Sequence, residues 1–548
     1  MNHQFLKYVC LFMVLISGLV HGQNTHLPST NEEIVIYQVN VRAFSQNGNI
    51  NGVLNRLDHI KDLGANVIYL MPLFKSSQSP YASSDFTEID PEYGTVGDLA
   101  NLIALAHQKG MAVIMDFAPN HTGTDHVWLD DPVYGYWWYQ QSHNTGAQGF
   151  HGPPPAHPGW TDVYQLDFDN ADLRDSLINT MKYWVNTVDC DGFRFDYADG
   201  PDVMLNDGDS DPANFQFQFW KQVISELRSM SKDLLLFAEG DGNEYFDLDF
   251  DLIYGNALFY EFKNWVFNTS VTGSVAASLN YANGFDFGAT NGQLPVRFTA
   301  NHDTHAHYGT PSQLFGGDAG QMGAFVVAAY MQGVPMIFSG QEVNTPNQVP
   351  FYTKGVNGTI DWSGIDGAIH NEFKSILGIR KASHAIKYGV LSDFSNNDVC
   401  GFTKVHNNEE VLVVANLKSN STVFDLPVAA QGSWTEAFTN EASQLGSSIS
   451  LDAYSYKVYR RGQFVTGFTN GQVTDIEIYP SPVHDKMIIT QIEKVDFKTL
   501  RVYNQKGTVV IEIPFSGIQY DVSKLTAGVY TLELVDDHGR SRQKFVKD

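Results

Sequence analysis

The sequence predicts an α/β protein in which a (β/α)8 TIM barrel is followed by two smaller all-β domains. Short apolar segments alternate with longer amphipathic segments from Ile34 to about Ile379, which is the pattern of a parallel barrel. After Arg380 the strand patterns are closely spaced, as in antiparallel sheets. Because 548 residues are too many for one compact core, several domains are expected. The expected divisions are a signal peptide at 1–22, the barrel at 23–374, a β-sandwich at 375–461, a linker at 462–474 and a last all-β domain at 475–548.

The barrel strands are expected where short apolar segments are bounded by polar residues. These segments are Ile34–Val39, Asn66–Leu70, Ala112–Asp116, Gly192–Asp196, Leu234–Glu239, Leu258–Phe262, Val296–Ala300 and Pro335–Phe338. Helices are expected between them, at Val53–Leu63, Asp98–Gly110, Asp172–Val188, Asn214–Met230 and Gly320–Gln332. In such a barrel the functional side chains lie at the carboxyl ends of the strands.

The first 22 residues have the pattern of a secretory signal peptide. Lys7 precedes an apolar run from Tyr8 to Val20, and a small-residue ending follows, with cleavage expected before Gln23. The run is too short to span a membrane, and we expect no transmembrane segment elsewhere. The sequence therefore predicts a secreted or cell-surface protein.

Charge and cysteine content restrict the classes of partner. The formal net charge of −27 argues against nucleic acid and anionic membranes as partners, and it favours a neutral substrate. Only Cys190 and Cys400 remain once the signal peptide is removed, which is no disulfide framework.

One connection in the barrel is unusually long. Between the third strand and the following helix lies an excursion subdomain, expected at 117–170, which has little periodicity and many aromatic residues. Loops of this length in a compact domain are normally functional. Some of its aromatic rings could stack on sugars, although most are better explained as the subdomain's own core.

Polar side chains follow several of the predicted strands. Arg194 and Asp196 stand two positions apart on one strand, so they point to the same face. An isolated Arg-x-Asp is more often a structural ion pair than a catalytic site. Here, however, Glu239 ends the fifth strand and Asn301-His302-Asp303 follow the seventh, so that the acids converge on one rim.

Three acids at one rim favour the hydrolysis of glycosidic bonds. Retention of configuration requires a carboxylate nucleophile and a second carboxyl group that protonates the leaving oxygen. Asp196 suits the nucleophile because a nearby cation keeps a carboxylate ionised. Glu239 suits the proton donor, and Asp303 could bind sugar hydroxyls. A metal hydrolase is disfavoured because no closely spaced histidine pair accompanies these strands; the pair His305 and His307 lies in the following loop and is left unassigned.

The segments DFAPNH, GFRFD, FAE and FTANHD resemble, in order, the signature regions of the α-amylase family of glycoside hydrolases (family thirteen). The resemblance extends from about Ile34 to Arg460. It implies Asp196 as nucleophile, Glu239 as acid/base and Asp303 as transition-state stabiliser. It also implies contacts with the sugar from Tyr81, His121, Arg194 and His302.

Two positions depart from the family pattern. Asp199 and Gly200 stand where many family members have Lys-His on the leaving-group side. The family's calcium site implies Asn120 and Asp167 as ligands here, together with a backbone carbonyl that Gly200 would supply. Oxygen ligands of this kind suit Ca²⁺, and calcium is therefore the expected cofactor.

The last domain resembles a type IX secretion sorting domain, through Ile478–Pro482, Arg501–Asn504, Leu525–Tyr530 and Lys544–Lys547. The resemblance implies that the export machinery is a partner. The alternative is a starch-binding β-module, although residues 475–548 contain no tryptophan.

The sequence therefore predicts a secreted, retaining, endo-acting hydrolase of α-1,4-glucans such as starch and maltodextrins. Family members that remove single glucose units commonly have an Asp after the stacking tyrosine, whereas here Tyr81 is followed by Ala82. The alternatives are a transglycosylase or a cyclodextrin/pullulan-type hydrolase of the same family, and a non-catalytic glucan-binding surface protein.

Overall fold

The chain forms two compact units, Met1–Gly462 and Gln463–Asp548, in a computed structural model. The structure describes residues 26–77, 79–130, 137, 161–168, 170–200, 218–240, 242–286, 292–352, 354–462, 476–479, 483–491, 498–504, 509–515, 519–535 and 540–548. The expected signal peptide, most of the excursion subdomain and residues 463–474 of the expected linker lie outside the described residues.

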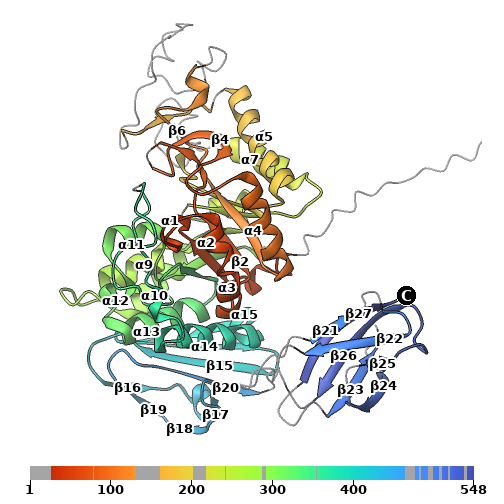
Figure 1. Ribbon diagram of the computed structural model, residues 1–548. Coiled ribbons are helices and arrows are strands. Elements are labelled where there is room, and N and C mark those ends of the chain that lie inside the picture. The colour runs from red at the N-terminus through yellow and green to blue at the C-terminus, as the bar shows by residue number, and fades with distance from the viewer. Residues whose placement is uncertain are drawn as a thin grey trace, which may run out of the picture. The chain divides into compact units, whose positions relative to one another are not determined.

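The first unit contains a closed parallel barrel, which confirms the predicted fold class (Figure 1). Around the barrel the strands follow the order β1-β12-β11-β10-β9-β8-β5-β2. They span Ile36–Val39 (β1), Val67–Leu70 (β2), Ala112–Phe117 (β5), Gly192–Phe195 (β8), Leu235–Ala238 (β9), Leu252–Tyr254 (β10), Leu294–Phe298 (β11) and Val334–Phe338 (β12). Every residue of these strands is buried, because the barrel interior packs on one face and the helices on the other.

Several helices around the barrel are amphipathic, as expected, and have local caps, whereas the helix over Gly317–Tyr330 is buried at every position from Gly320 onward. In α4 a capping box joins Thr95 and Asp98 at the start, and in α5 the Asn170 side chain accepts from two backbone N–H groups. The helices span Val41–Phe44 (α1), Ile50–Leu54 (α2), Leu57–Leu63 (α3), Val96–Gln108 (α4), Ala171–Val188 (α5), Gln218–Arg228 (α7), Glu244–Asp247 (α8), Asn256–Glu261 (α9), Val275–Asp286 (α10), His302–Tyr308 (α11), Pro311–Leu314 (α12), Gly317–Tyr330 (α13), Ala368–Ala382 (α14) and His384–Tyr388 (α15).

The predicted sixth strand, Leu258–Phe262, is wrong. These residues lie in α9 and at the start of a π-helix over Phe262–Val266, and the sixth strand is the three-residue β10. Leu258, Phe259 and Phe262 are all buried, and a short apolar run of this kind does not distinguish a strand from a buried helix.

Beside the barrel mouth lie two short antiparallel ribbons. β3 (Phe74–Ser76) pairs with β4 (Ser83–Ile89), and β6 (His121–Gly123) pairs with β7 (Val163–Gln165) at the base of the excursion subdomain. Trp128 packs edge-on against Trp137, with 4.8 Å between the ring centroids. This contact is consistent with the interpretation of the aromatic residues as the subdomain's own core, although Trp128 also packs against Phe86 of β4. The other aromatic residues between 131 and 160 lie outside the described residues.

The first unit also contains the predicted antiparallel β-sandwich. A six-stranded sheet of order β13-β14-β15-β20-β17-β18 faces a two-stranded sheet, β16-β19, across a core that includes Leu412, Phe424 and Trp434. The strands span Val390–Asp393 (β13), Val399–His406 (β14), Glu409–Asn416 (β15), Thr422–Asp425 (β16), Gly432–Glu436 (β17), Ala442–Leu445 (β18), Ser448–Leu451 (β19) and Tyr456–Gly462 (β20). Cys190 and Cys400 are buried free thiols.

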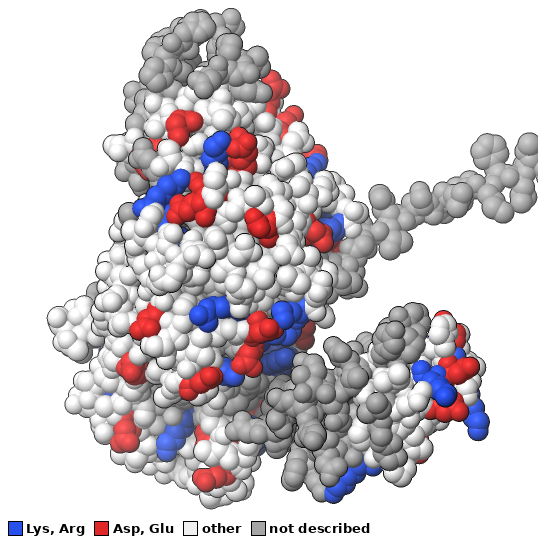
Figure 2. All heavy atoms as spheres, in the orientation of Figure 1, with Lys and Arg blue, Asp and Glu red and all other residues white. Residues whose placement is uncertain are grey.

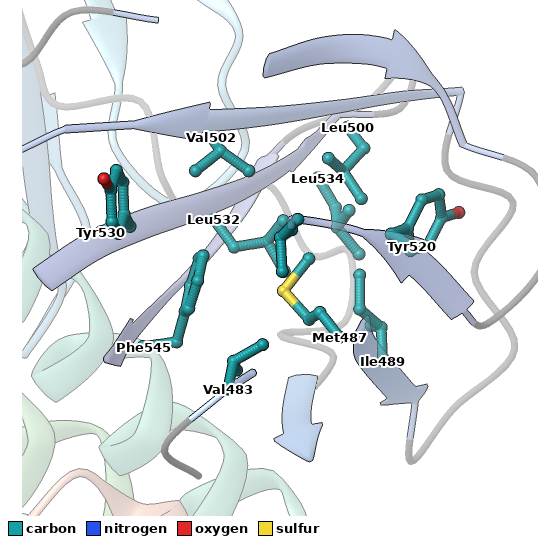
Figure 3. Close-up of a cluster of buried hydrophobic side chains, with 11 residues drawn as sticks. Val483, Met487, Ile489, Leu500, Val502, Tyr520, Tyr530, Leu532, Leu534 and Phe545 are labelled. Carbon is teal, nitrogen blue, oxygen red and sulfur yellow. The ribbon is translucent and has the colours of Figure 1, made fainter. Parts of the chain in front are cut away.

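The second unit is a small all-β domain with a hydrophobic core of its own. Sheets β21-β22-β25 and β24-β23-β26-β27 both contribute to it, and Figure 3 shows Met487 and Ile489 from the first sheet against Leu532 and Phe545 from the second. The strands span Ile476–Tyr479 (β21), Lys486–Gln491 (β22), Thr499–Tyr503 (β23), Val509–Pro514 (β24), Gln519–Asp521 (β25), Gly528–Val535 (β26) and Arg540–Lys547 (β27).

Acidic and basic side chains are interspersed on the visible face of the described residues (Figure 2). Among the helices that the structure describes, none is both long and apolar enough to cross a bilayer.

Candidate active site

Arg194 lies at the centre of the polar cluster at the barrel mouth. It is fully buried on β8, and its Nη1 donates to both Asp116 oxygens, at 2.8 and 2.9 Å, and to Asp196 Oδ1 at 2.8 Å. Its Nη2 lies 2.8 Å from Glu239 Oε2, in an ion pair without hydrogen-bond alignment. One guanidinium group therefore contacts three carboxylates, which it can do because it is planar and carries donors on both sides.

Strand register explains why these acids meet. Asp116 pairs with Arg194 across β5 and β8, and Phe195 pairs with Ala238 across β8 and β9. The Asp196 N–H donates to the Phe117 carbonyl, and the Glu239 N–H donates to the Phe195 carbonyl, which continues the ladder one step past each strand. The two predicted catalytic acids are thus fixed by the backbone at the carboxyl ends of adjacent strands.

The carboxyl group of Asp196 does not behave as expected. Burial raises its pKa well above the ordinary range, and the charge of Glu239 raises it further. Arg194 acts in the opposite direction without outweighing these effects. Arg194 thus favours the ionised form of Asp196, as predicted, but burial and the charge of Glu239 outweigh its effect, so the pKa of Asp196 is raised and not kept low.

This raised pKa leads to a stability prediction. A carboxyl group whose pKa is raised by folding contributes stability at low pH, and the contribution is lost as the pH rises through the folded-state pKa. Asp196→Asn removes a group that must ionise in a buried place. It should therefore raise the melting temperature at about pH 8, and the gain should shrink toward about pH 4.

Asp191, which directly precedes the first residue of β8, provides a matched control. Burial alone would raise its pKa, but a 2.7 Å contact with His107 and a 3.1 Å ion pair with Lys232 outweigh burial and lower it. Its contribution to stability is present above the unfolded-state pKa and is lost as the pH falls through the folded-state pKa. Asp191→Asn should therefore lower the melting temperature at neutral pH but not in acid. Thermal unfolding across pH measures both variants, and a destabilised Asp196→Asn at pH 8 would contradict the assignment.

A second chain of hydrogen bonds connects the third predicted acid to Arg194. The Tyr81 hydroxyl donates to Asp116 Oδ2 at 2.9 Å and lies 2.8 Å from His302 Nε2, which in turn lies 3.3 Å from Asp303 Oδ2. Gln38 Nε2 contacts His302 Nδ1 at 2.8 Å. Since this amide nitrogen can only donate, Nδ1 accepts and Nε2 carries the proton.

Burial lowers the pKa of His302 to about 3, so its imidazole is neutral at working pH. It can therefore donate from Nε2 without adding charge to the site. Burial raises the pKa of Asp303, whose side chain is 40% exposed and so remains accessible to a ligand. Phe351 packs edge-on against both Tyr81 and His302.

His121 lies at the start of β6, where it supports Tyr81. Its Nε2 lies 3.2 Å from the Tyr81 carbonyl oxygen, and its Nδ1 lies 3.2 Å from Asn120 Nδ2. The structure thus brings together Tyr81, Arg194, Asp196, Glu239, His302 and Asp303, whereas His121 reaches the site through the Tyr81 backbone.

The residues predicted to hold calcium do not fit that ion. Asn120 Oδ1 accepts a hydrogen bond from Gln165 Nε2 at 2.7 Å, and Asn120 Nδ2 donates back to Gln165 Oε1 at 3.0 Å. Asp167 is buried two residues further along. Within the described part of the chain, no three His, Cys, Asp or Glu side chains are placed to hold a metal ion.

Several residues of the site were missed by the sequence prediction. Asp116 was recognised only as part of a motif, although it joins Arg194 to Tyr81 and also accepts from Tyr69 at 2.6 Å. Tyr254, whose ring lies 5.3 Å from the Arg194 guanidinium carbon, follows no motif. The signal available for Asp116 was its place near the end of a buried strand.

The segment that follows β8 also has unusual geometry. Tyr197 adopts a φ of +46°, which is rare for a residue with a side chain, and its N–H donates to Glu239 Oε2 at 2.7 Å. Asp199 accepts from the Tyr245 hydroxyl, and burial raises the pKa of Asp199. Outside the site, His305 Nδ1 accepts from the Val349 N–H and is structural.

Comparison with known proteins agrees with this geometry. The family model of the α-amylase catalytic domain matches residues 24–154 and 156–424, which is most of the chain. The chain belongs to the α-amylase family. It is therefore a glycoside hydrolase, as predicted. Further family models match residues 392–458, as the C-terminal domain of maltogenic amylase, and residues 477–548, as a secretion system C-terminal sorting domain.

Other α-amylase family members are similar along most of the chain. Alpha-amylase 3 of Dictyoglomus thermophilum is 26% identical over 475 residues, which cover 77% of this chain and 92% of that relative. A cyclomaltodextrinase of Thermoanaerobacter pseudethanolicus is 24% identical over 69% of this chain and 65% of its own length. The crystal structure of an α-amylase from Geobacillus thermoleovorans with acarbose has a TM-score of 0.63 at 21% identity, over 79% of this chain and 99% of that one, which shows a shared fold.

Proposed function

We propose that this α-amylase family member hydrolyses internal α-1,4 bonds of glucans with retention, using Asp196 as nucleophile and Glu239 as acid/base. The observation that carries the proposal is the contact of both carboxylates with opposite nitrogens of the Arg194 guanidinium. This contact keeps the two groups a few ångströms apart, as a double displacement at one carbon requires.

In the first step, Asp196 attacks the anomeric carbon while Glu239 protonates the departing glycosidic oxygen. The carbon–oxygen bond breaks as the bond to Asp196 forms, and the shortened glucan leaves with the proton. Glu239 Oε2 is occupied by the Tyr197 N–H and Arg194, so the transferred proton resides on Oε1. Arg194 holds the orientation of both acids throughout.

In the second step, Glu239 takes a proton from water, whose oxygen attacks the same carbon and releases Asp196. His302 contacts both Tyr81 and Asp303, and His302 and Asp303 would bind the hydroxyl groups of the distorted sugar. We also propose that Tyr81 stacks on this sugar, because its ring is partly exposed and is held by hydrogen bonds at its hydroxyl group.

Two features support internal cleavage. Tyr81 is followed by Ala82, Ser83 and Ser84, which are small and buried, so these positions place no large exposed side chain beside Tyr81. Tyr352, next to Phe351, is 50% exposed and could contact a longer chain. Distant sugars that bind in this way would supply energy for the reaction at the scissile bond.

A second candidate is a hydrolase of cyclodextrins or short maltodextrins. It is favoured by the match of residues 392–458 to the C-terminal domain of maltogenic amylase and by cyclomaltodextrinases among the relatives. A transglycosylase would use the same residues and differ in the acceptor of the second step. The secretion sorting domain supports export, for which we propose residues 1–22 as the signal peptide and the type IX machinery as the partner.

Products and viscosity test the proposal. Starch viscosity should fall much faster than reducing ends appear, and maltoheptaose should be a far better substrate than maltose, because an internal cut needs sugars on both sides. Chromatography of early products, with Asp196→Asn as a blank for contaminating activity, gives the measurement. Glucose as the sole early product would contradict internal cleavage, and faster turnover of cyclodextrin than of starch would favour the second candidate.

A further inference from the structure

The junction between the barrel and the excursion subdomain contains a reciprocal pair of amides. Asn120, just before β6, is fully buried, and Gln165, the last residue of β7, is 4% exposed. β6 and β7 pair in antiparallel register with His121 opposite Gln165, which brings the Gln165 side chain to Asn120. We infer that the amide group of Gln165 takes the place of a calcium ion here, so that the chain holds this junction without metal.

The Gln165 nitrogen lies where a cation would have to lie. Its Nε2 donates to Asn120 Oδ1 at 2.7 Å and to the Asn120 backbone oxygen at 2.8 Å. Ca²⁺ requires oxygen ligands at about 2.3–2.6 Å, so an ion shared by these two oxygens would overlap the amide nitrogen. The polarised N–H bonds direct positive charge at both oxygens, as the ion would.

The orientation of the amides follows from their partners. The Asn120 backbone oxygen can only accept, so the Gln165 atom that faces it must be the nitrogen. Gln165 Oε1 then faces Asn120 Nδ2, which donates to it at 3.0 Å. Reversal of either amide would place two acceptors or two donors together.

Gly200 also packs closely against Asn120. A Cβ atom at this position would lie 2.2 Å from Asn120 Oδ1, so only glycine permits the observed orientation of that amide. Gly200 is one of the two departures from the family pattern, and it thus fits the same arrangement as Gln165. Asn120 is thus paired with Gln165 through hydrogen bonds and packs closely against Gly200.

The amide pair also supports the sugar site. Asn120 Nδ2 lies 3.2 Å from His121 Nδ1, and His121 Nε2 lies 3.2 Å from the Tyr81 carbonyl oxygen. Gln165 therefore acts as a positioning residue for Tyr81 through Asn120 and His121.

Melting temperature and metal content test the inference independently of catalytic activity. The wild-type protein should contain no stoichiometric calcium by elemental analysis after gel filtration. Its melting temperature should be the same in chelator and in excess Ca²⁺, because an ion that is not bound cannot stabilise the folded state.

Gln165→Glu should convert the junction into a calcium site. The Gln165 Nε2 group donates to Asn120 Oδ1 and to the Asn120 backbone oxygen, and a carboxylate cannot donate to either. The variant would therefore bring a negatively charged acceptor next to two unsatisfied acceptor oxygens. In chelator this variant should melt below the wild type, and added Ca²⁺ should restore its melting temperature in a saturable manner.

Gln293→Glu is the matched control. Gln293 is also a buried glutamine, and its Nε2 donates to the Phe246 and Phe250 carbonyls at 2.7 and 3.1 Å. This variant should lose stability without recovery by Ca²⁺. One bound calcium per wild-type chain, or a wild-type melting temperature that falls in chelator, would overturn the inference. A folded Gln165→Glu variant whose melting temperature is the same with and without Ca²⁺ would also overturn it. If Gln165→Glu does not fold, the wild-type measurements decide.

Discussion

Asp196→Asn is expected to lower kcat on starch by about 10⁴-fold or more, because the amide cannot form the covalent intermediate. Glu239→Gln is expected to lower kcat by about 10²–10⁴-fold, the usual contribution of a general acid. The two variants should differ on an aryl maltoside with a good leaving group. Such a substrate needs little protonation, so Glu239→Gln should recover most of its first step while Asp196→Asn stays inactive.

Asp191→Asn controls for the loss of a buried acid near the same strand. Asp191 directly precedes the first residue of β8, whereas Asp196 follows the last. The ion-pair partners of Asp191 are His107 and Lys232. Its kcat should stay close to that of the wild type. Wild-type turnover by Asp196→Asn, or equal losses for Glu239→Gln on starch and on the aryl substrate, would refute the proposed roles.

Arg194→Met is expected to abolish activity and to destabilise the folded protein by about 3–5 kcal/mol, the cost of leaving buried charges without a partner. Burial already raises the pKa values of Asp116 and Asp196, and Arg194 opposes this rise for both groups. Without it these pKa values should rise further. Since such groups lose their stabilising contribution as the pH rises, the destabilisation should grow from about pH 5 to about pH 8.

Arg42→Met is the matched control for Arg194. Arg42 is 1% exposed but pairs with one carboxylate, Glu92, through contacts of 2.8 and 3.2 Å, and the side chain of Glu92 is 18% exposed. Water can therefore solvate Glu92 when its partner is removed, so the loss should be smaller and should change less with pH. Denaturant unfolding at several pH values measures both variants. A pH-independent loss in Arg194→Met would contradict the account of the three-carboxylate cluster.

The barrel could be predicted because buried parallel strands have a distinctive composition. Segments such as Ala112–Asp116 and Pro335–Phe338 are short and apolar, and β5 and β12 lie within two residues of the predicted bounds. The sixth strand could not be predicted from the same signal. β10 has three residues, and the longer apolar run beyond it belongs to α9, whose burial comes from tertiary packing that periodicity alone does not reveal.

The residues of the candidate site that lie at the ends of strands could be predicted from the sequence. The residues that orient other side chains of the site could not. Arg194, Asp196 and Glu239 share one rim, so strand geometry alone brings them together. The residues that orient the His302 and Asn120 side chains come from elsewhere in the chain. Gln38 lies on β1 and Gln165 on β7, and neither belongs to a charged motif. The direction of the pKa shift of Asp196 depends on its burial, which no local pattern contains.

The C-terminal domain encloses its hydrophobic core within its own sequence. Val483, Met487, Leu532 and Phe545 lie in that core, and the last strand, β27, contributes Phe545 and pairs with β26 along its length. A domain with its own core can fold without the enzyme that precedes it. The domain should therefore fold in the same way when it is fused to the C-terminus of an unrelated secreted protein. A purification tag is better placed before the barrel than after β27, because β27 is part of the folded domain.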